Sequence, residues 1–395
     1  MNNSFSHLSS EEQLLLSMAR LKFSGAQREQ IRRLAERITD WDYFVSLANA
    51  HGLIALYHNN ISITGIIGIV PAKVADTFRS AYLRSLSQNT RLHRLLEEIL
   101  SISTLENIRV ILLKGAVLEK IVYGNTGLRQ MSDIDLLVKD DEALPLRNLL
   151  LKNGFESLPL ISPLHEKLLP CLKSHLPVMH KSGISAEIHV RLFDRNNEPL
   201  ICEIINNPDV IADSTPEILA PPLQLHFLYL VKHLDKHART KDLQLKLYAD
   251  LVALLTEYPD QLLNANLLSL AEKAGLINPM AEILLLMERF WNIRFPAMIK
   301  DLISNVNSEK ITEKFIYFLR HPSSYPRHEE KFTLLRPLYD IPGVAGKIRF
   351  IAGYLFPSLS FLRYKFRLNH KSTALFYYPA WWWRSLKIAQ GKLIS

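Results

Sequence analysis

Apolar side chains recur at the three- and four-residue spacing of amphipathic helices over the first hundred residues. Ile31, Leu34 and Ile38 fall on one face of such a helix. A longer segment, residues 72–105, is also expected to be helical. The pattern therefore predicts an N-terminal helical region over residues 1–105.

The pattern changes at residues 110–113, a short apolar run with β-branched side chains that suits a buried strand. Lys114 and Gly115 end the run, and residues 116–123 are helical in character. This order predicts a strand, a tight glycine turn and the start of a helix. Backbone N–H groups at such a helix start, with the helix dipole behind them, favour phosphate.

A loop with two glycines, Gly124 and Gly127, leads to a second predicted strand at residues 133–138. Asp133 and Asp135 lie two positions apart, so their side chains point to the same side of that strand. Two neighbouring carboxylates repel each other unless a cation lies between them. Divalent ions such as Mg²⁺ bind oxygen ligands of this kind together with substrate phosphates. A phosphate cradle followed by a carboxylate pair indicates nucleotide chemistry.

A third acidic residue follows in a predicted β-hairpin, formed by residues 176–180 and 184–193. Alternation along the second strand places Glu187, His189 and Arg191 on one face and apolar side chains on the other. Glu187 is therefore able to face the aspartate pair.

The remainder of the chain is expected to be mostly helical. Residues 208–222 are rich in proline and are predicted to form a linker. Apolar spacing then predicts helices at residues 223–237, 243–258, 261–274 and 277–291.

Together these segments resemble the polymerase-beta-like nucleotidyltransferase superfamily. More narrowly, three features resemble a bacterial family of uncharacterised nucleotidyltransferases that is often found near polysaccharide genes. They are Leu-Lys-Gly-Ala ending at Ala116, Arg129 four residues before Asp133-Ile-Asp-Leu-Leu-Val, and Glu-Ile-His beginning at Glu187. The resemblance covers about residues 40–255 and extends more weakly to the tail. Ala116 stands where the superfamily pattern has serine, and the loop from Gly115 to Asp133 is longer than in the shortest members.

The resemblance implies an α+β fold, in which a polymerase-beta-like nucleotidyltransferase core, a small mixed sheet with helices, is embedded between helical regions. It implies transfer of a nucleoside monophosphate from a nucleoside triphosphate, with ATP expected, to an unidentified hydroxyl acceptor. A saccharide, a small metabolite, a protein hydroxyl and an RNA end all stay open as acceptors. Two Mg²⁺ ions, or Mn²⁺ in their place, would be held by Asp133, Asp135 and Glu187. The nucleotide would be bound by Lys114, Gly115, Ala116 and Arg129.

His233 and Asp250 match a helical motif of that family, a histidine followed by Asp-Leu. Two interpretations stay open for this pair, since the side chains either line the nucleotide cleft, as His189 would, or serve as helix caps and ion-pair partners. His233 and His237 also have the spacing of a zinc-protease pair. The residue after His233 is leucine, so the glutamate that would act as the base is missing, and no third ligand is evident.

The chain has 395 residues, which favours two to three domains. We expect the helical region 1–105, the transferase core 106–207, a helical domain 208–307 and a C-terminal tail 308–395. Two distant cysteines argue for a reducing compartment. The sequence shows no signal-peptide pattern and no apolar run near the ~20 residues that span a bilayer. A cytoplasmic location is expected.

Positive charge is concentrated at the C-terminal end. Residues 341–395 hold nine lysines and arginines and no acidic residue, so residues 1–340 carry a net charge of about −1. The tail from residue 308 is expected to be irregular, and it contains three consecutive tryptophans, Trp381 to Trp383, beside Arg384. Three interpretations stay open: the rings pack on the protein body, contact a membrane surface, or bind nucleic acid, for which no recognised motif is present.

Metal-dependent nucleotidyl transfer is the leading hypothesis for function. The alternative is a catalytically inactive protein of the same fold, which binds a nucleotide or a partner and docks on membrane or nucleic acid through its basic tail. The presence of all three acidic residues argues for the enzyme.

Overall fold

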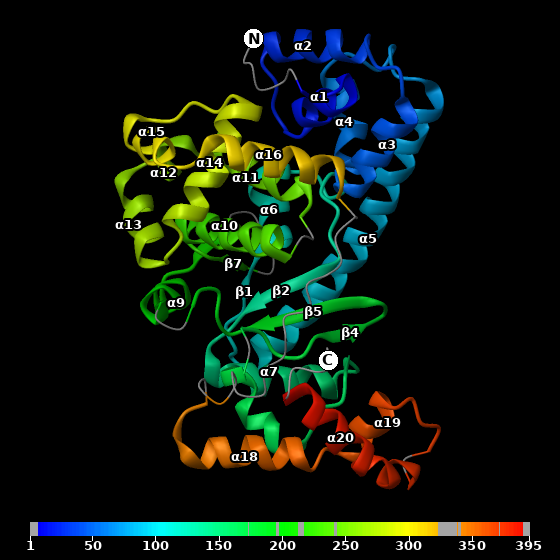
Figure 1. Cartoon of the computed structure of the whole chain (residues 1–395), viewed down its shortest axis with the longest axis vertical. Helices are drawn as coiled ribbons and strands as arrows, with labels where there is room; N and C mark the ends of the chain where they lie inside the picture. The colour runs from blue at the N-terminus through cyan, green and yellow to red at the C-terminus, as the bar shows by residue number, and fades with distance from the viewer. Residues whose placement is uncertain are drawn as a thin grey trace. The chain divides into compact units, whose positions relative to one another are not determined.

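A single mixed sheet of seven strands is the centre of the fold in the computed structural model (Figure 1). The structure describes residues 7–172, 174–194, 197–211, 217–240, 243–322, 338, 341–370 and 372–389. The strand order is β3-β4-β5-β2-β1-β7-β6. The strands are β1 (Ile111–Leu112), β2 (Asp133–Leu137), β3 (Glu156–Ser157), β4 (Met179–Lys181), β5 (Ile184–His189), β6 (Asp209–Ile211) and β7 (Ile218–Ala220). A small mixed sheet among helices confirms the predicted α+β class.

The sheet combines both strand directions. Strand β1 pairs in parallel with β7, whereas β3–β4, β4–β5 and β6–β7 are antiparallel. The predicted hairpin is β4–β5, and its turn residues Ser182 and Gly183 both have positive φ, as a two-residue hairpin turn requires. The prediction of a linker at residues 208–222 was wrong where the structure describes it, since β6 and β7 lie there; residues 212–216 lie outside the described part.

The chain divides into two compact units. The first comprises Met1–Glu98, Ile111–Asp135 and Phe193–Arg327, and the second comprises Ile99–Val110, Leu136–Leu192 and His328–Ser395. The division falls inside β2, directly after Asp135.

The first unit contains the predicted N-terminal helices. They are α1 (Ser10–Met18), α2 (Gly25–Ala35), α3 (Trp41–Ala50), α4 (Ile54–Ile63) and most of α5 (Ala72–Leu105). Ser9 and Glu12 form a reciprocal capping box at the start of α1. Phe44, Tyr57 and Phe78 are buried together, with the Phe44 and Tyr57 rings stacked 5.7 Å apart.

The remaining helices of the first unit follow β1 and β5. They are α6 (Lys114–Leu118), the π-helix η2 (Glu119–Tyr123), α9 (Glu198–Asn206), α10 (Leu223–Thr240), α11 (Leu245–Glu257), α12 (Pro259–Leu262), α13 (Ala265–Lys273), α14 (Ile277–Trp291), α15 (Ala297–Ser304) and α16 (Ser308–Arg320). Helix α16 begins where the tail was expected to become irregular, so that prediction was wrong. Its cap is Asn307, whose side chain accepts a hydrogen bond from the Lys310 amide.

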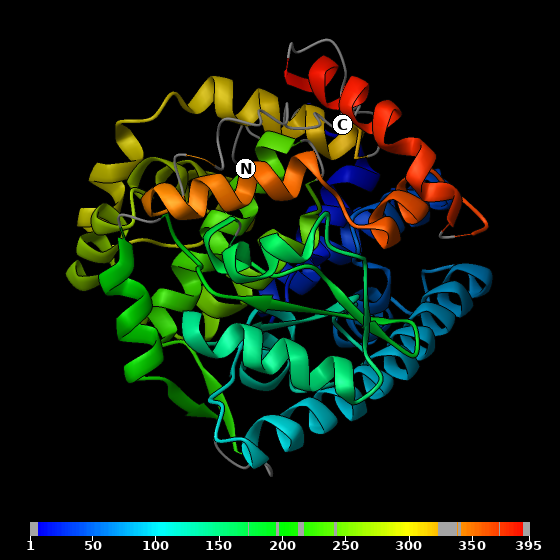
Figure 2. The ribbon, with the colours of Figure 1, turned by 90° about the horizontal axis from the view of Figure 1, so that it is seen from below.

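In the second unit, α7 (Asp140–Lys152) packs beside β5 (Figure 2). Two short helices, η3 (Pro163–Leu168) and α8 (Leu169–Leu172), follow it. The C-terminal segment forms α18 (Gly343–Leu355), α19 (Leu359–Lys365), η5 (Ser372–Tyr377) and α20 (Tyr378–Ala389), and is not irregular as predicted. Residues 323–337, 339–340, 371 and 390–395 of the expected tail lie outside the described part. Among the described residues, no helix has the length and apolar character needed to cross a bilayer.

The C-terminal helices have a small core of their own. Tyr354, Leu362, Ala374 and Trp381 are buried together, and the Trp381 indole N–H donates to the Tyr354 carbonyl oxygen at 2.8 Å. Trp382 and Trp383 are exposed. Trp381 therefore packs inward and Trp383 is exposed, whereas Trp382 is anchored by its indole N–H, which donates to the Leu355 carbonyl oxygen at 2.6 Å.

We expect Trp381→Ala to shift the urea unfolding midpoint of the full chain strongly, because removing a buried ring costs about 3–5 kcal/mol. Trp383→Ala, at an exposed neighbour, should change the free energy of unfolding by less than about 0.5 kcal/mol. Far-UV circular dichroism during urea titration measures both. Equal shifts would contradict the inward packing of Trp381.

Candidate active site

The predicted strand, turn and helix start are present at β1, Lys114 and α6. The Leu113 amide donates to the Asp135 carbonyl oxygen at 3.0 Å, which sets the end of β1 beside β2. Lys114 has a left-handed backbone with φ 48°, a conformation that costs a side-chain-bearing residue about 1–2 kcal/mol. Its backbone N–H donates to Nε2 of His226 on α10 at 3.2 Å.

The turn directs the Lys114 side chain onto the aspartate strand. Nζ of Lys114 lies 2.7 Å from Oδ1 of Asp135, and both side chains are largely buried. Burial disfavours the charged ammonium, but attraction by Asp135 outweighs it, so the pKa of Lys114 is raised. The lysine is therefore a permanent positive charge at this carboxylate. Asp133, two residues earlier, is half-buried and accepts a hydrogen bond from the Ser132 hydroxyl.

Arg129 forms a buried ion pair with Asp250 of α11. Its Nε and Nη2 donate to the two carboxylate oxygens at 2.9 and 2.8 Å, and the Tyr123 hydroxyl donates to Oδ1 at 2.8 Å. This bidentate geometry is the strongest form of an arginine–carboxylate pair. The Asp250 carboxylate therefore acts as an ion-pair partner of Arg129, which is one of the two interpretations that the sequence left open.

Gly115 lies directly against this ion pair. A Cβ atom at position 115 would lie 2.3 Å from Nη1 of Arg129 and 2.9 Å from Sδ of Met131. A side chain there would force the guanidinium out of its pairing geometry. Glycine is thus needed at this turn for the approach of Arg129.

A polar cavity of about 220 Å³ opens at this point in the first unit. Lys114, Gly115 and Arg129 line it from the turn and loop, and Asp133 and Asp135 line it from β2. Helices α10 and α11 contribute His233, His237, Gln244, Lys246 and Leu247. Burial, with Lys114 nearby, lowers the pKa of His233 to about 2, so this histidine is neutral.

On β5 of the second unit, Glu187 and His189 point to the same side, as the alternation predicted. Oε2 of Glu187 lies 3.5 Å from Nε2 of His189. Within this unit, Glu187 and His189 thus offer a carboxylate oxygen and an imidazole nitrogen. Such a mixed pair of ligands suits a divalent ion such as Mn²⁺, whereas Mg²⁺ prefers oxygen alone.

Sequence reasoning missed His226 and Tyr123. His226 lies seven residues before His233 on α10, a spacing that places both on one helix face and that was visible in the sequence. The hydrogen bond between Tyr123 and Asp250 was not visible there, because 127 residues separate the two.

A mixed sheet between helices, with acidic residues on β2 beside a glycine turn, is the arrangement of a nucleotidyltransferase core. The chain belongs to the family described as uncharacterised nucleotidyltransferases, whose model matches residues 38–292. Membership places it among transferases at a general level. A comparison with curated proteins found no match.

We expect Gly115→Ala to destabilise the chain by about 1–3 kcal/mol, because the new methyl group overpacks a buried contact. Gly68→Ala is the matched control, since an added Cβ there meets no atom within 4 Å. Urea unfolding of both variants measures the difference. Equal stability of the two would show that Arg129 moves aside without cost.

Acid should weaken the fold through His226. Burial and the charge of Arg129 lower its pKa to about 3, so the unfolded chain binds this proton more tightly. The histidine's contribution is fully present above about pH 6.5 and is lost as pH falls toward 3. Lowering the pH from 7.5 to 5.5 should therefore reduce the free energy of unfolding by about 1.4 kcal/mol through His226 alone.

Urea unfolding of the wild type and His226→Gln at both pH values isolates this contribution, because the other histidines are common to both chains. The variant should lose less stability on acidification than the wild type. An identical loss in both chains would contradict the neutral, buried state of His226.

Proposed function

We propose that the chain transfers a nucleoside monophosphate from a nucleoside triphosphate to a hydroxyl acceptor. The acceptor oxygen forms a bond to the α-phosphorus, the bond from that phosphorus to the β-phosphate oxygen breaks, and pyrophosphate leaves. The hydroxyl proton passes to a carboxylate of the site. The observation that carries this proposal is the polar cavity that Asp133 and Asp135 line together with the Lys114–Gly115 turn, in a chain of the nucleotidyltransferase family.

The donor set fits a divalent ion. Asp133, Asp135 and Glu187, with His189 as an added nitrogen ligand, would hold Mg²⁺ or Mn²⁺, and two ions are the expectation. When bound, the metal would supply positive charge for the triphosphate and lower the pKa of the acceptor hydroxyl. Asp135 already has a cationic neighbour in the Lys114 ammonium, 2.7 Å away, which supports the view that this carboxylate stays ionised.

The residues around the turn have separate tasks in this proposal. Lys114 stays protonated and attracts the triphosphate, while Gly115 and Ala116 bring the backbone close to it. Arg129 lines the same cavity, but its charge is shared with Asp250, so we assign it the positioning of the loop. Phosphoryl transfer needs mainly such positioning and charge stabilisation. ATP and a saccharide hydroxyl are the first substrates to test.

A binding protein without turnover is the second candidate. Two observations favour it. The Lys114 ammonium forms an ion pair with Asp135, so a metal ion would have to compete with it for this carboxylate. Ala116 offers no hydroxyl to a phosphate. Such a protein would retain nucleotides without releasing pyrophosphate.

Asp133→Ala/Asp135→Ala should abolish turnover, with a loss of at least about a thousandfold, because charge stabilisation is usually the largest catalytic contribution. The assay follows transfer of α-labelled ATP, GTP, CTP or UTP to cell extract, with Mg²⁺ or Mn²⁺. Asp42→Ala/Asp76→Ala, at two exposed aspartates, is the matched control and should transfer label like the wild type.

Metal binding gives a readout that is independent of activity. Isothermal titration with Mn²⁺ alone should show binding to the wild type and to the Asp42/Asp76 control, and none to the Asp133/Asp135 variant. Equal label transfer by the double variant would defeat the assignment of the site. Nucleotide binding by the wild type without pyrophosphate release would favour the second candidate.

A further inference from the structure

The C-terminal helices of the second unit expose an unusual number of apolar side chains. We call α18, α19, η5 and α20 together the C-terminal surface (orange to red in Figure 1). Phe376 is 82% exposed and Trp383 is 59% exposed, although this segment has its own core around Trp381. Exposed aliphatic side chains accompany the rings, including Val344, Ile348 and Leu386. Exposed apolar side chains concentrated in one segment are typical of an interaction surface.

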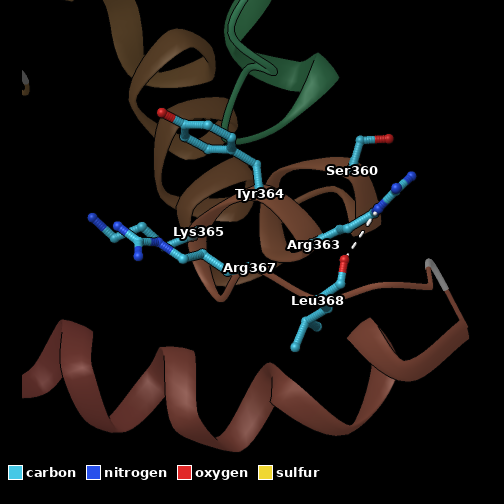
Figure 3. Close-up of a pocket in the computed structure, with 6 residues that line it drawn as sticks. All are labelled: Ser360, Arg363, Tyr364, Lys365, Arg367 and Leu368. Atoms are coloured by element: carbon cyan, nitrogen blue, oxygen red, sulfur yellow. Dashed lines mark hydrogen bonds between the residues drawn. The ribbon is translucent and has the colours of Figure 1, made fainter.

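The same surface is uniformly positive. Residues 341–395 contain no acidic side chain. Arg363, Lys365 and Arg367 line a shallow hollow on α19 and the turn after it (Figure 3). Lys365 and Arg367 extend to one side of the helix, and Arg363 extends to the other, where its Nε donates to the Leu368 carbonyl oxygen.

A further cation, Arg384 of α20, lies near Lys365. Burial and the positive charge of Arg384 lower the pKa of Lys365. Residues 341–395 supply no acidic side chain to balance these charges, so an external anion would stabilise the charged form of Lys365.

We propose that the C-terminal surface docks on an anionic phospholipid bilayer. The lipid phosphates would pair with the cations around Lys365 and Arg384. The exposed rings would lie at headgroup level, and the aliphatic side chains would enter the acyl boundary. This inference is independent of the proposed transferase activity.

Other occupants match the surface less well. Nucleic acid offers phosphates and faces for stacking, but it gives no apolar environment to Val344, Ile348 and Leu386. A second copy of the chain would bring the same positive charge against this surface, and like charges repel. An anionic bilayer satisfies both the charge and the apolar side chains.

Co-sedimentation of the full chain with vesicles tests the proposal. One set is phosphatidylcholine alone, and the other is equal parts phosphatidylcholine and phosphatidylglycerol. We expect binding to the anionic vesicles, weakened by salt, and little binding to the neutral ones.

Two variants separate the contributions of charge and apolar contact. Arg363→Gln/Lys365→Gln/Arg367→Gln should weaken binding to anionic vesicles by about a hundredfold. Phe376→Ser/Trp383→Ser should weaken it by about tenfold or more, because apolar insertion is lost. The matched control is Ile67→Ser/Leu83→Ser, which changes two exposed apolar residues of the first unit and should bind like the wild type. Urea unfolding confirms that each variant is folded.

Several outcomes would overturn the proposal. They are equal binding to neutral and anionic vesicles, unchanged binding of a folded charge variant, or loss of binding in the Ile67/Leu83 control. Tight binding of a short RNA, lost in the charge variant while vesicles do not bind, would assign the surface to nucleic acid. Self-association in sedimentation velocity that the Phe376/Trp383 variant abolishes, again without vesicle binding, would assign it to a second copy.

Discussion

The buried ion pair between Arg129 and Asp250 is the constraint on which the candidate active site depends. Its two members are 121 residues apart, and both lose their water when the chain folds. Only good geometry repays that loss, and here two parallel hydrogen bonds and the Tyr123 hydroxyl supply it. The pair ties the loop before β2 to helix α11. It also explains Gly115, because the guanidinium occupies the space that a side chain would need.

Around this pair, positive charge is kept on Lys114 and Arg129, whereas His226 and His233 are neutral. His226 and His233 are buried beside cations, so their protonation is disfavoured. The pKa of Lys114 is raised instead, because attraction by the Asp135 carboxylate outweighs the cost of burying the ammonium group. Three buried groups in one small region thus have fixed protonation states at neutral pH. A site of this kind presents the same charge to a substrate over a wide pH range.

Local patterns predicted the features that depend on neighbours in sequence. The two-residue period placed Asp133 beside Asp135 and Glu187 beside His189. The partner of Arg129 could not be predicted, because distant segments decide it. Strands β6 and β7 were missed because three residues are too few to show a period, and prolines surround them. The C-terminal helices were missed because packing around Trp381, rather than a regular apolar stripe, stabilises them.

The π-helical turn η2 sets the direction of two side chains of the site. A π-turn holds one more residue than an α-turn, and here it contains Glu119, which pairs with His93, and ends at Tyr123, which reaches Asp250. A regular α-turn of the same five residues would rotate by about 100° per residue, more than the wider π-turn does, so Tyr123 would turn away from its carboxylate. Substitutions that favour a regular α-helix here would therefore act on the distant ion pair through the backbone alone.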